Sequence, residues 1–175
     1  MAPRRTIVKL PNLLSSSRFL LAVGFVMVQS TAVRVVLVAL AAASDFLDGW
    51  VARRVQATSR WGALLDPIAD RVFVLVAVGT FLFTGMLGTG AYFVLIMRDL
   101  ATAVGFIVAR IIPWLRPVVF KARMSGKVVT ALQLATLAAV LVAPAAVSWL
   151  LWLVAAVSVV SIVDYTLALW RARAQ

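Results

Sequence analysis

The 175-residue chain has no cysteine, no histidine and no glutamate, and its six acidic residues are all aspartates. Without cysteine there is no disulfide framework and no thiol chemistry. Without histidine the chain lacks the commonest general base and the usual zinc ligand. Any acid–base or metal chemistry must therefore use aspartate.

Charged residues are also scarce, at 13% of the chain, whereas 64% of residues are hydrophobic and the mean hydropathy is +1.06. These values exclude an ordinary soluble domain and predict an all-α integral membrane protein with a single domain over residues 1–175. The net charge of +11 indicates anionic membrane lipid as a partner and not nucleic acid. The short basic N-terminus lacks a small-residue cleavage pattern, so we expect a mature cytosolic end.

Apolar runs predict six transmembrane helices, near 13–29, 34–54, 63–83, 90–112, 127–143 and 147–170. Several contain about 20 residues, which is enough to span the hydrocarbon core. Before the first of them, Ile7, Val8 and Leu10 lie beside basic residues and predict a short N-terminal interfacial helix. Pro113 and Pro117 exclude one continuous helix between the fourth and fifth spans.

Basic residues alternate with uncharged turns along the chain. The N-terminus and the segments 53–60, 110–127 and 171–173 are basic, whereas the turns 84–90 and 143–146 carry no charge and only Arg34 breaks the alternation. The positive-inside rule therefore places both termini and the basic loops in the cytosol. We expect a bacterial inner (cytoplasmic) membrane protein with its active site facing the cytosol.

Four of the six aspartates lie between residues 45 and 70, inside otherwise apolar sequence. A carboxylate at bilayer depth costs about 2.5–3.5 kcal/mol on insertion scales, and four together repel one another. A single aspartate of this kind is often a buried ion-pair member. Four in register, with two glycines and an arginine, instead indicate a site for divalent metal.

The cluster falls into two sets with helical spacing. These are Asp45, Asp48, Gly49 and Ala52 on the second predicted helix, and Gly62, Asp66 and Asp70 on the third. Within each set the residues share one helix face. Because the link between the two helices is short, we expect antiparallel neighbours whose aspartates meet near the cytosolic surface.

This combination of residues predicts diphosphate chemistry. Carboxylate oxygens suit Mg²⁺, Mn²⁺ or Ca²⁺, and Arg53 offers a guanidinium fork for phosphate. A two-metal site can hold a diphosphate and orient an attacking hydroxyl. We assign the role of general base to Asp70, because it lies deepest in the third predicted helix.

The window resembles the signature of the CDP-alcohol phosphatidyltransferases, D-x2-D-G-x2-A-R-x8-G-x3-D-x3-D, and meets its eight fixed positions at every spacing. The resemblance implies a six-helix membrane fold, usually a homodimer. It implies a transferase of phospholipid biosynthesis that moves a phosphatidyl or similar group from a CDP-linked donor, such as CDP-diacylglycerol, to an alcohol with release of CMP.

The resemblance also implies roles for individual residues. Asp45, Asp48 and Asp66 would ligate two divalent cations, Mg²⁺ or Mn²⁺, while Asp70 would lie at the same metal site and act as the catalytic base. The CDP pocket would be formed by Asp48, Gly49, Ala52, Arg53 and Gly62.

Landmarks outside the signature bear on the acceptor. The segment 11–15 together with Arg18 resembles the N-terminal segment of both phosphatidylglycerophosphate synthases and eukaryotic-type cardiolipin synthases. The former usually carry Arg-Glu where this chain has Arg98-Asp99, and Phe106 stands where they have a later arginine. They also favour G-K-x-K-T-x2-Q, in which Val129 here replaces the second lysine.

From these landmarks the main prediction is a cardiolipin synthase that uses phosphatidylglycerol. The alternative is a phosphatidylglycerophosphate synthase that uses glycerol 3-phosphate, and another alcohol such as an inositol phosphate remains open. Candidate acceptor-binding residues are Arg98, Asp99, Arg110, Arg123 and Lys127.

Two structural interpretations and a different function class stay open beside these predictions. The basic residues between 110 and 127 also serve topology and headgroup contact, and Arg98 with Asp99 also suits a buried structural pair. An intramembrane cation transporter is the alternative of another class. It is disfavoured because no acidic path continues from the cluster to the other membrane face.

Overall fold

The computed structural model describes residues 9–54, 62–111 and 124–173, and every regular element in these ranges is an α-helix. The helices are α1 (Lys9–Met27), α2 (Thr31–Arg54), α3 (Gly62–Phe83), α4 (Thr89–Ile111), α5 (Met124–Val142) and α6 (Pro144–Arg173). The prediction of an all-α chain with six helices is therefore confirmed.

Four helices, α1, α2, α5 and α6, begin three or four residues earlier than expected, and two of these starts contain a proline. α1 begins at Lys9 and includes Leu10 and Pro11, so these residues do not form a separate interfacial helix; residues 1–8 lie outside the described ranges. α6 begins at Pro144, inside a segment expected to be a turn. Proline is tolerated in the first turn of a helix, where its missing N–H would have had no intrahelical partner.

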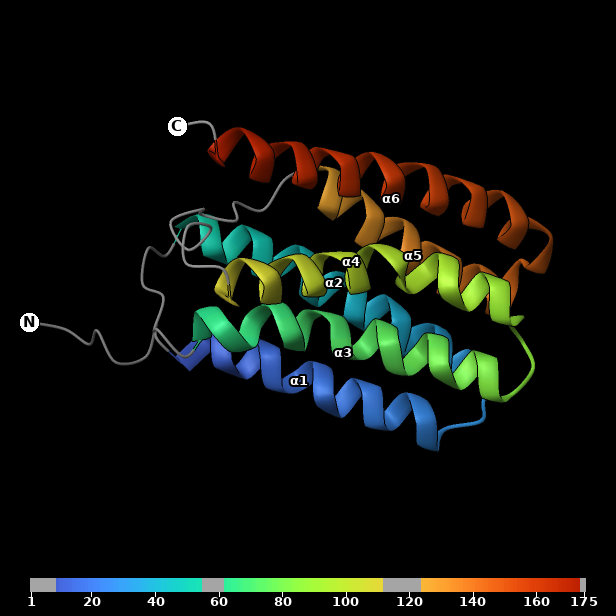
Figure 1. Cartoon of the computed structure of the whole chain (residues 1–175). Helices are drawn as coiled ribbons and strands as arrows, with labels where there is room; N and C mark the ends of the chain where they lie inside the picture. Colours follow the sequence, from blue (N-terminus) through green and yellow to red (C-terminus); the bar gives the residue numbers. More distant parts are fainter. Residues whose placement is uncertain (1–8, 55–61, 112–123, 174–175) are drawn as a thin grey trace, which may run out of the picture.

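The helices alternate in direction along a single bundle (Figure 1). We call one end the signature end; it contains the start of α1, α3 and α5 and the last turns of α2, α4 and α6. The other, the distal end, contains the turns 28–30 and 84–88 and residue 143. All the segments predicted to be basic and cytosolic adjoin the signature end.

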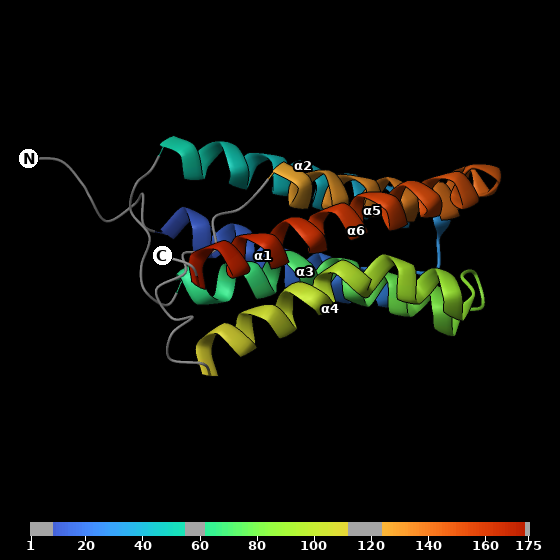
Figure 2. The same ribbon diagram turned by 45° about the horizontal axis from the view of Figure 1, so that its top comes forward.

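α1 packs closely against two other helices. It packs on α3 and on α2, while α2 packs on α5 and α3 on α4. In Figure 2, α2 runs along one side of the bundle and α3 and α4 along the other. α2 and α3 run in opposite directions (Figure 1), as expected; that their signature aspartates meet stays a prediction, because the side chains of Asp48, Asp66 and Asp70 lie outside the described part.

Aromatic packing holds α1 against α3. The ring of Phe25 lies edge-on to Phe73 at 5.7 Å and to Phe81 at 5.4 Å between centroids. All three side chains are buried. Such aromatic pairs contribute about 0.5–1.5 kcal/mol beyond the burial of their area.

α3 ends in a Schellman motif built on glycine. Gly85 has φ of +71°, which costs a glycine no Cβ clash. The N–H of Met86 donates to the carbonyl of Phe81 at 2.8 Å, and that of Gly85 to Leu82 at 3.1 Å. These bonds pair carbonyls that the helix end leaves without partners and turn the chain toward α4.

The outer surface of the bundle is strongly apolar. α6 exposes Trp149, Trp152 and Trp170 to at least 70% of their area, as is typical of a surface that contacts lipid or another protein. In the described ranges α6 has one segment, Pro144–Asp164, that is long and apolar enough to cross a membrane, and α1, α3 and α5 contain shorter apolar stretches. The prediction of six membrane spans stays a prediction.

Candidate functional site

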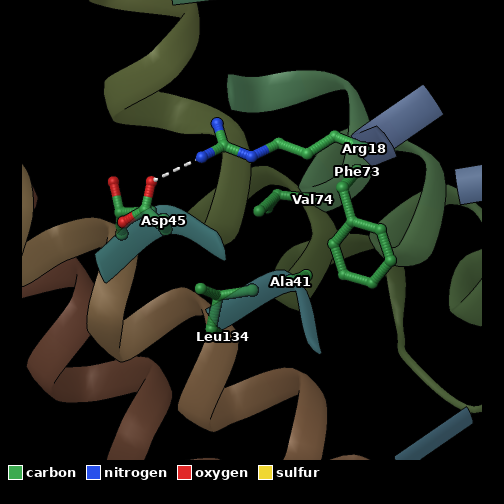
Figure 3. A pocket seen from close by; sticks show the side chains of 7 residues that line it. Arg18, Ala41, Asp45, Phe73, Val74 and Leu134 are labelled. Carbon is green, nitrogen blue, oxygen red and sulfur yellow. Dashed lines mark ion pairs between the residues drawn. The ribbon is translucent and has the colours of Figure 1, made fainter. Parts of the chain in front are cut away.

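The first signature aspartate, Asp45, lies on α2 beside a buried arginine from α1. Arg18 is 2% exposed, and its Nη2 lies 3.6 Å from Oδ1 of Asp45, whose side chain is 40% exposed (Figure 3). The Nε of Arg18 donates to Ser44 Oγ at 3.3 Å, and this hydroxyl donates to the carbonyl of Ala41 at 3.0 Å. A buried cation is costly without such partners, so Arg18 and Asp45 stabilise one another across the α1–α2 contact.

A small cavity adjoins this ion pair, and its lining residues come from α1, α2, α3 and α5. It is lined by Arg18, Ala41, Asp45, Phe73, Val74, Thr130 and Leu134. In Figure 3 Arg18 and Asp45 point toward one another, and Phe73 and Val74 of α3 complete the wall. α2 and α3 therefore face each other across a small space that carries one carboxylate and one guanidinium.

The other signature residues lie on the expected helices at the signature end. Asp48, Gly49, Ala52 and Arg53 belong to the last turns of α2, and Gly62, Asp66 and Asp70 to the first turns of α3. Their helical backbone makes the spacing within each set a shared face. Their side chains lie outside the described part, so their metal-binding, CDP-binding and catalytic roles stay predictions.

Asp45 has the properties that a metal ligand needs. Its contact with Arg18, at 3.6 Å, is longer than a charge-assisted hydrogen bond of about 2.7–2.9 Å. The side chain is partly open, so carboxylate lone pairs remain available, and such oxygens suit Mg²⁺ and Mn²⁺. Among the described side chains no group of three or more candidate ligands occurs; of the four signature aspartates, these include Asp45 alone.

A second polar network surrounds Asp99 of α4 and reaches three helices. Its Oδ1 accepts from Arg71 Nη1 at 2.6 Å and from Arg98 Nη1 at 3.0 Å. Its Oδ2 accepts from Gln133 Nε2 of α5 at 2.9 Å. Arg71 also donates to Thr102 Oγ1 at 2.8 Å.

This geometry bears on the two interpretations of Arg98 and Asp99. Both are at least 94% buried, and both carboxylate oxygens of Asp99 are engaged by protein donors. The arrangement matches a buried structural network, one of the alternatives left open from sequence. Because Arg71 directly follows Asp70, the network also holds the segment that carries the predicted base. A direct role of Arg98 and Asp99 in acceptor binding stays a prediction.

The remaining acceptor candidates are dispersed around the signature end. Lys127 lies in the first turns of α5 and is exposed, and Arg110 lies in the last turn of α4, where its side chain is outside the described part. Arg123 lies outside the described ranges. The structure thus provides one exposed cation, Lys127, in this group.

Two residues beside the site were missed as site residues from sequence. Arg18 belongs to the N-terminal landmark but had no role, and Arg71 was not considered. The available signal was local charge balance: a cation within an apolar helix requires a carboxylate partner, and both arginines face aspartates.

Comparison with protein families gives a match over most of the chain. A sequence model of the family described as CDP-alcohol phosphatidyltransferase matches residues 8–160, which includes both helices of the signature and the Asp99 network.

Several relatives carry the same name. A protein of Aquifex aeolicus (strain VF5) named CDP-diacylglycerol–glycerol-3-phosphate 3-phosphatidyltransferase is 37% identical over 100 residues, which cover 54% of this chain and 56% of that protein. A protein of the same name from Yersinia pestis (strain Pestoides F) is 45% identical over 60 residues, 34% of this chain and 33% of that one. The similarity thus spans about half or less of each relative's length.

Proposed function

The chain belongs to the CDP-alcohol phosphatidyltransferase family, and we propose that it transfers a phosphatidyl group from CDP-diacylglycerol to glycerol 3-phosphate and releases CMP. The acceptor is taken from the names of the relatives. These names favour the alternative over the main prediction from sequence, which was phosphatidylglycerol. Family membership also favours a transferase over a cation transporter.

The observation that carries the proposal is the placement of Asp45. A partly exposed carboxylate, backed by the buried guanidinium of Arg18, faces a cavity between α2 and α3 at the signature end. The three further aspartates occupy the adjacent turns of the same two helices. Such a set of hard oxygen ligands fits two divalent cations, with Asp45, Asp48, Asp66 and Asp70 as the residues that would hold them.

The proposed reaction is a substitution at the phosphorus of the phosphatidyl group. The hydroxyl oxygen of glycerol 3-phosphate forms a bond to this phosphorus, and the phosphoanhydride bond to the CMP phosphate breaks. The leaving CMP takes the bonding electron pair, and the hydroxyl proton passes to the carboxylate of Asp70. When bound, the cations would neutralise charge that develops on the diphosphate.

The chain's own residues orient the two substrates. Gly49, Ala52 and Gly62 leave room for the nucleotide beside the helix backbones. Arg53 offers its guanidinium fork to a phosphate oxygen.

The acceptor is held by a separate group of basic residues. The exposed Lys127, together with Arg110 and Arg123, supplies cations for the dianionic phosphate of glycerol 3-phosphate.

The setting of the reaction is part of the same proposal. We place the enzyme in the bacterial cytoplasmic membrane as a homodimer, with the signature end in the cytosol. The apolar outer surface supports a lipid environment, from which CDP-diacylglycerol can enter laterally. Anionic lipids suit the basic residues that adjoin the signature end.

A paired turnover assay tests the proposal. Detergent-purified protein receives CDP-diacylglycerol, Mg²⁺ or Mn²⁺, and either glycerol 3-phosphate or phosphatidylglycerol, and the lipid products are identified by mass spectrometry. We expect phosphatidylglycerophosphate from the first acceptor. Cardiolipin from the second acceptor alone would contradict the proposed acceptor and restore the main prediction from sequence.

Matched variants connect the activity to the aspartates. Asp45→Asn and Asp66→Asn should abolish turnover while the far-ultraviolet circular dichroism stays unchanged. Asp164→Asn, outside the signature, is the control and should retain turnover. Full activity of either signature variant would contradict the metal assignment.

A further inference from the structure

A buried arginine at the distal end has no place in the proposed reaction. Arg34 lies in the first turns of α2 and is 8% exposed. It is the residue that breaks the alternation of basic and uncharged segments. The next acidic residue along α2 is Asp45, eleven positions later, which is about 16 Å along the helix axis. The helix therefore offers Arg34 no nearby carboxylate.

The contacts of Arg34 use only part of its guanidinium. Its Nε donates to the carbonyl of Val28 at 2.8 Å, one of the carbonyls that the end of α1 leaves without an intrahelical partner. The guanidinium carbon lies 5.2 Å from the centroid of the Phe25 ring, within the range of a cation–π interaction. Within the described ranges, no protein group accepts a hydrogen bond from its two terminal amino groups.

A cavity opens beside this guanidinium. It is lined by Val26, Gln29, Arg34, Thr80, Phe83 and Thr84. The hydroxyl of Thr80 donates to the backbone carbonyl of Val76 at 2.7 Å, and the hydroxyl of Thr84 donates to the backbone carbonyl of Thr80 at 2.9 Å. Their protons are thus engaged, so the donors for a ligand in this cavity are Arg34 and the amide of Gln29. The lining contains one cation and no acidic residue.

We propose that this cavity binds a phosphate group, with Arg34 as the principal donor. The Arg34 side chain is mostly buried and lines the cavity without a carboxylate beside it, which favours a bound anion. The planar pair of amino groups matches two phosphate oxygens. The N-terminus of α2 lies within one turn and adds positive electrostatic potential. The site is at the opposite end of the bundle from the signature aspartates and is independent of the proposed transfer.

The phosphate could belong to a membrane lipid or be free in solution, and the cavity suits both chemically. Val26 is 50% exposed and Phe83 is 91% exposed, so an acyl chain has an apolar surface beside the guanidinium. The competing explanation is that Arg34 only closes the end of α1 through Val28. A cap of this kind needs no anion, and its function would not respond to a new negative charge in the cavity.

Native mass spectrometry of the detergent-purified chain distinguishes these possibilities, because it counts bound molecules. The probes are dihexanoyl phosphatidylglycerol, dihexanoyl phosphatidylcholine and inorganic phosphate. The variants are Arg34→Gln, which removes the cation, and Thr84→Asp, which places a carboxylate at an exposed position of the lining. Thr84→Asn is the matched control without charge. The signature end remains intact in all of them, so binding there is a constant background.

We expect Arg34→Gln and Thr84→Asp each to lose one bound phosphate-bearing molecule, or to bind it at least tenfold more weakly, while Thr84→Asn binds as the parent does. Loss seen with phosphatidylglycerol but not with inorganic phosphate identifies a lipid headgroup, whereas loss with both identifies a general phosphate site. Unchanged binding in Thr84→Asp overturns the proposal, even if Arg34→Gln fails to fold.

Discussion

At the scale of single residues, isolated charges in an apolar chain find partners that lie far away in sequence. Arg18 is 2% exposed and contacts both Ser44 and Asp45. Its guanidinium therefore restrains the carboxylate of Asp45, the first of the four aspartates in the predicted metal site. Groups that orient a metal ligand are often nearly as important as the ligand itself.

Replacement of Arg18 by glutamine should lower turnover about 10–100-fold, the usual effect of losing a partner of a metal ligand. We expect a higher Mn²⁺ or Mg²⁺ concentration at half-maximal rate, because Asp45 loses its restraint. Titration of turnover with each metal measures this shift.

Two variants serve as controls for Arg18. Ser44→Ala removes the hydrogen bonds of this hydroxyl to Arg18 Nε and to the carbonyl of Ala41 but leaves the contact with Asp45, so it should have a smaller effect. Arg18→Lys keeps a cation and should recover part of the activity. A metal dependence of Arg18→Gln identical to that of the parent would contradict a positioning role.

At the scale of elements, α3, α4 and α5 are joined by one carboxylate. Asp99 accepts hydrogen bonds from Arg71 of α3 and Gln133 of α5 as well as from its neighbour Arg98. Gln133 also donates to the carbonyl of Leu95 at 2.6 Å. The network therefore sets how the three helices meet.

Asp99→Asn should lower the free energy of unfolding by about 3–5 kcal/mol, because the buried Arg98 and the half-buried Arg71 lose this ion pair. Thr102→Val, which removes one hydrogen-bond partner of Arg71, should cost about 1 kcal/mol. Unfolding in detergent can be followed by the fluorescence of the six tryptophans.

The opposite pattern would indicate acceptor binding. If Asp99→Asn unfolded like the parent and only raised the KM for glycerol 3-phosphate, then Asp99 would contact the acceptor and the structural interpretation would be wrong.

At the scale of the whole molecule, the bundle is polarised. The predicted cytosolic segments adjoin the signature end, and the uncharged turns form the distal end (Figure 1). This separation of charge is what the positive-inside rule requires of a polytopic membrane protein. It also places the proposed transfer site and the Arg34 cavity at opposite ends.

The lack of cysteine makes this topology directly measurable, since each introduced cysteine is a single reporter. In inverted and right-side-out membrane vesicles, a membrane-impermeant maleimide should label Lys127→Cys from the cytosolic side and Gly88→Cys and Ala145→Cys from the other side. All three positions are exposed.

Ser158→Cys is the control for this experiment, because Ser158 is fully buried and its substitution changes volume little. It should remain unlabelled from both sides. Labelling of Gly88→Cys and Lys127→Cys from one common side would exclude the six-span arrangement.

Short-range features could be predicted from the sequence. Helical spacing put Asp45 with Asp48 and Asp66 with Asp70 on shared faces, because the α-helix repeats every 3.6 residues whatever surrounds it. Two of the errors in helix limits occur near Pro11 and Pro144, where the same residue either starts a helix or interrupts one, and α2 and α5 also begin three residues earlier than expected. The family resemblance came from this local spacing as well.

Tertiary structure alone decided which helices touch. Sequence analysis did not foresee that α1 packs on both α2 and α3, where Phe25 is buried against Phe73 and Phe81. The pairings of Arg18 with Asp45 and of Gln133 with Asp99 join residues 27 and 34 positions apart. Hydrophobic burial is non-directional, so an apolar pattern determines that a surface is buried, and only the packed bundle determines its partner.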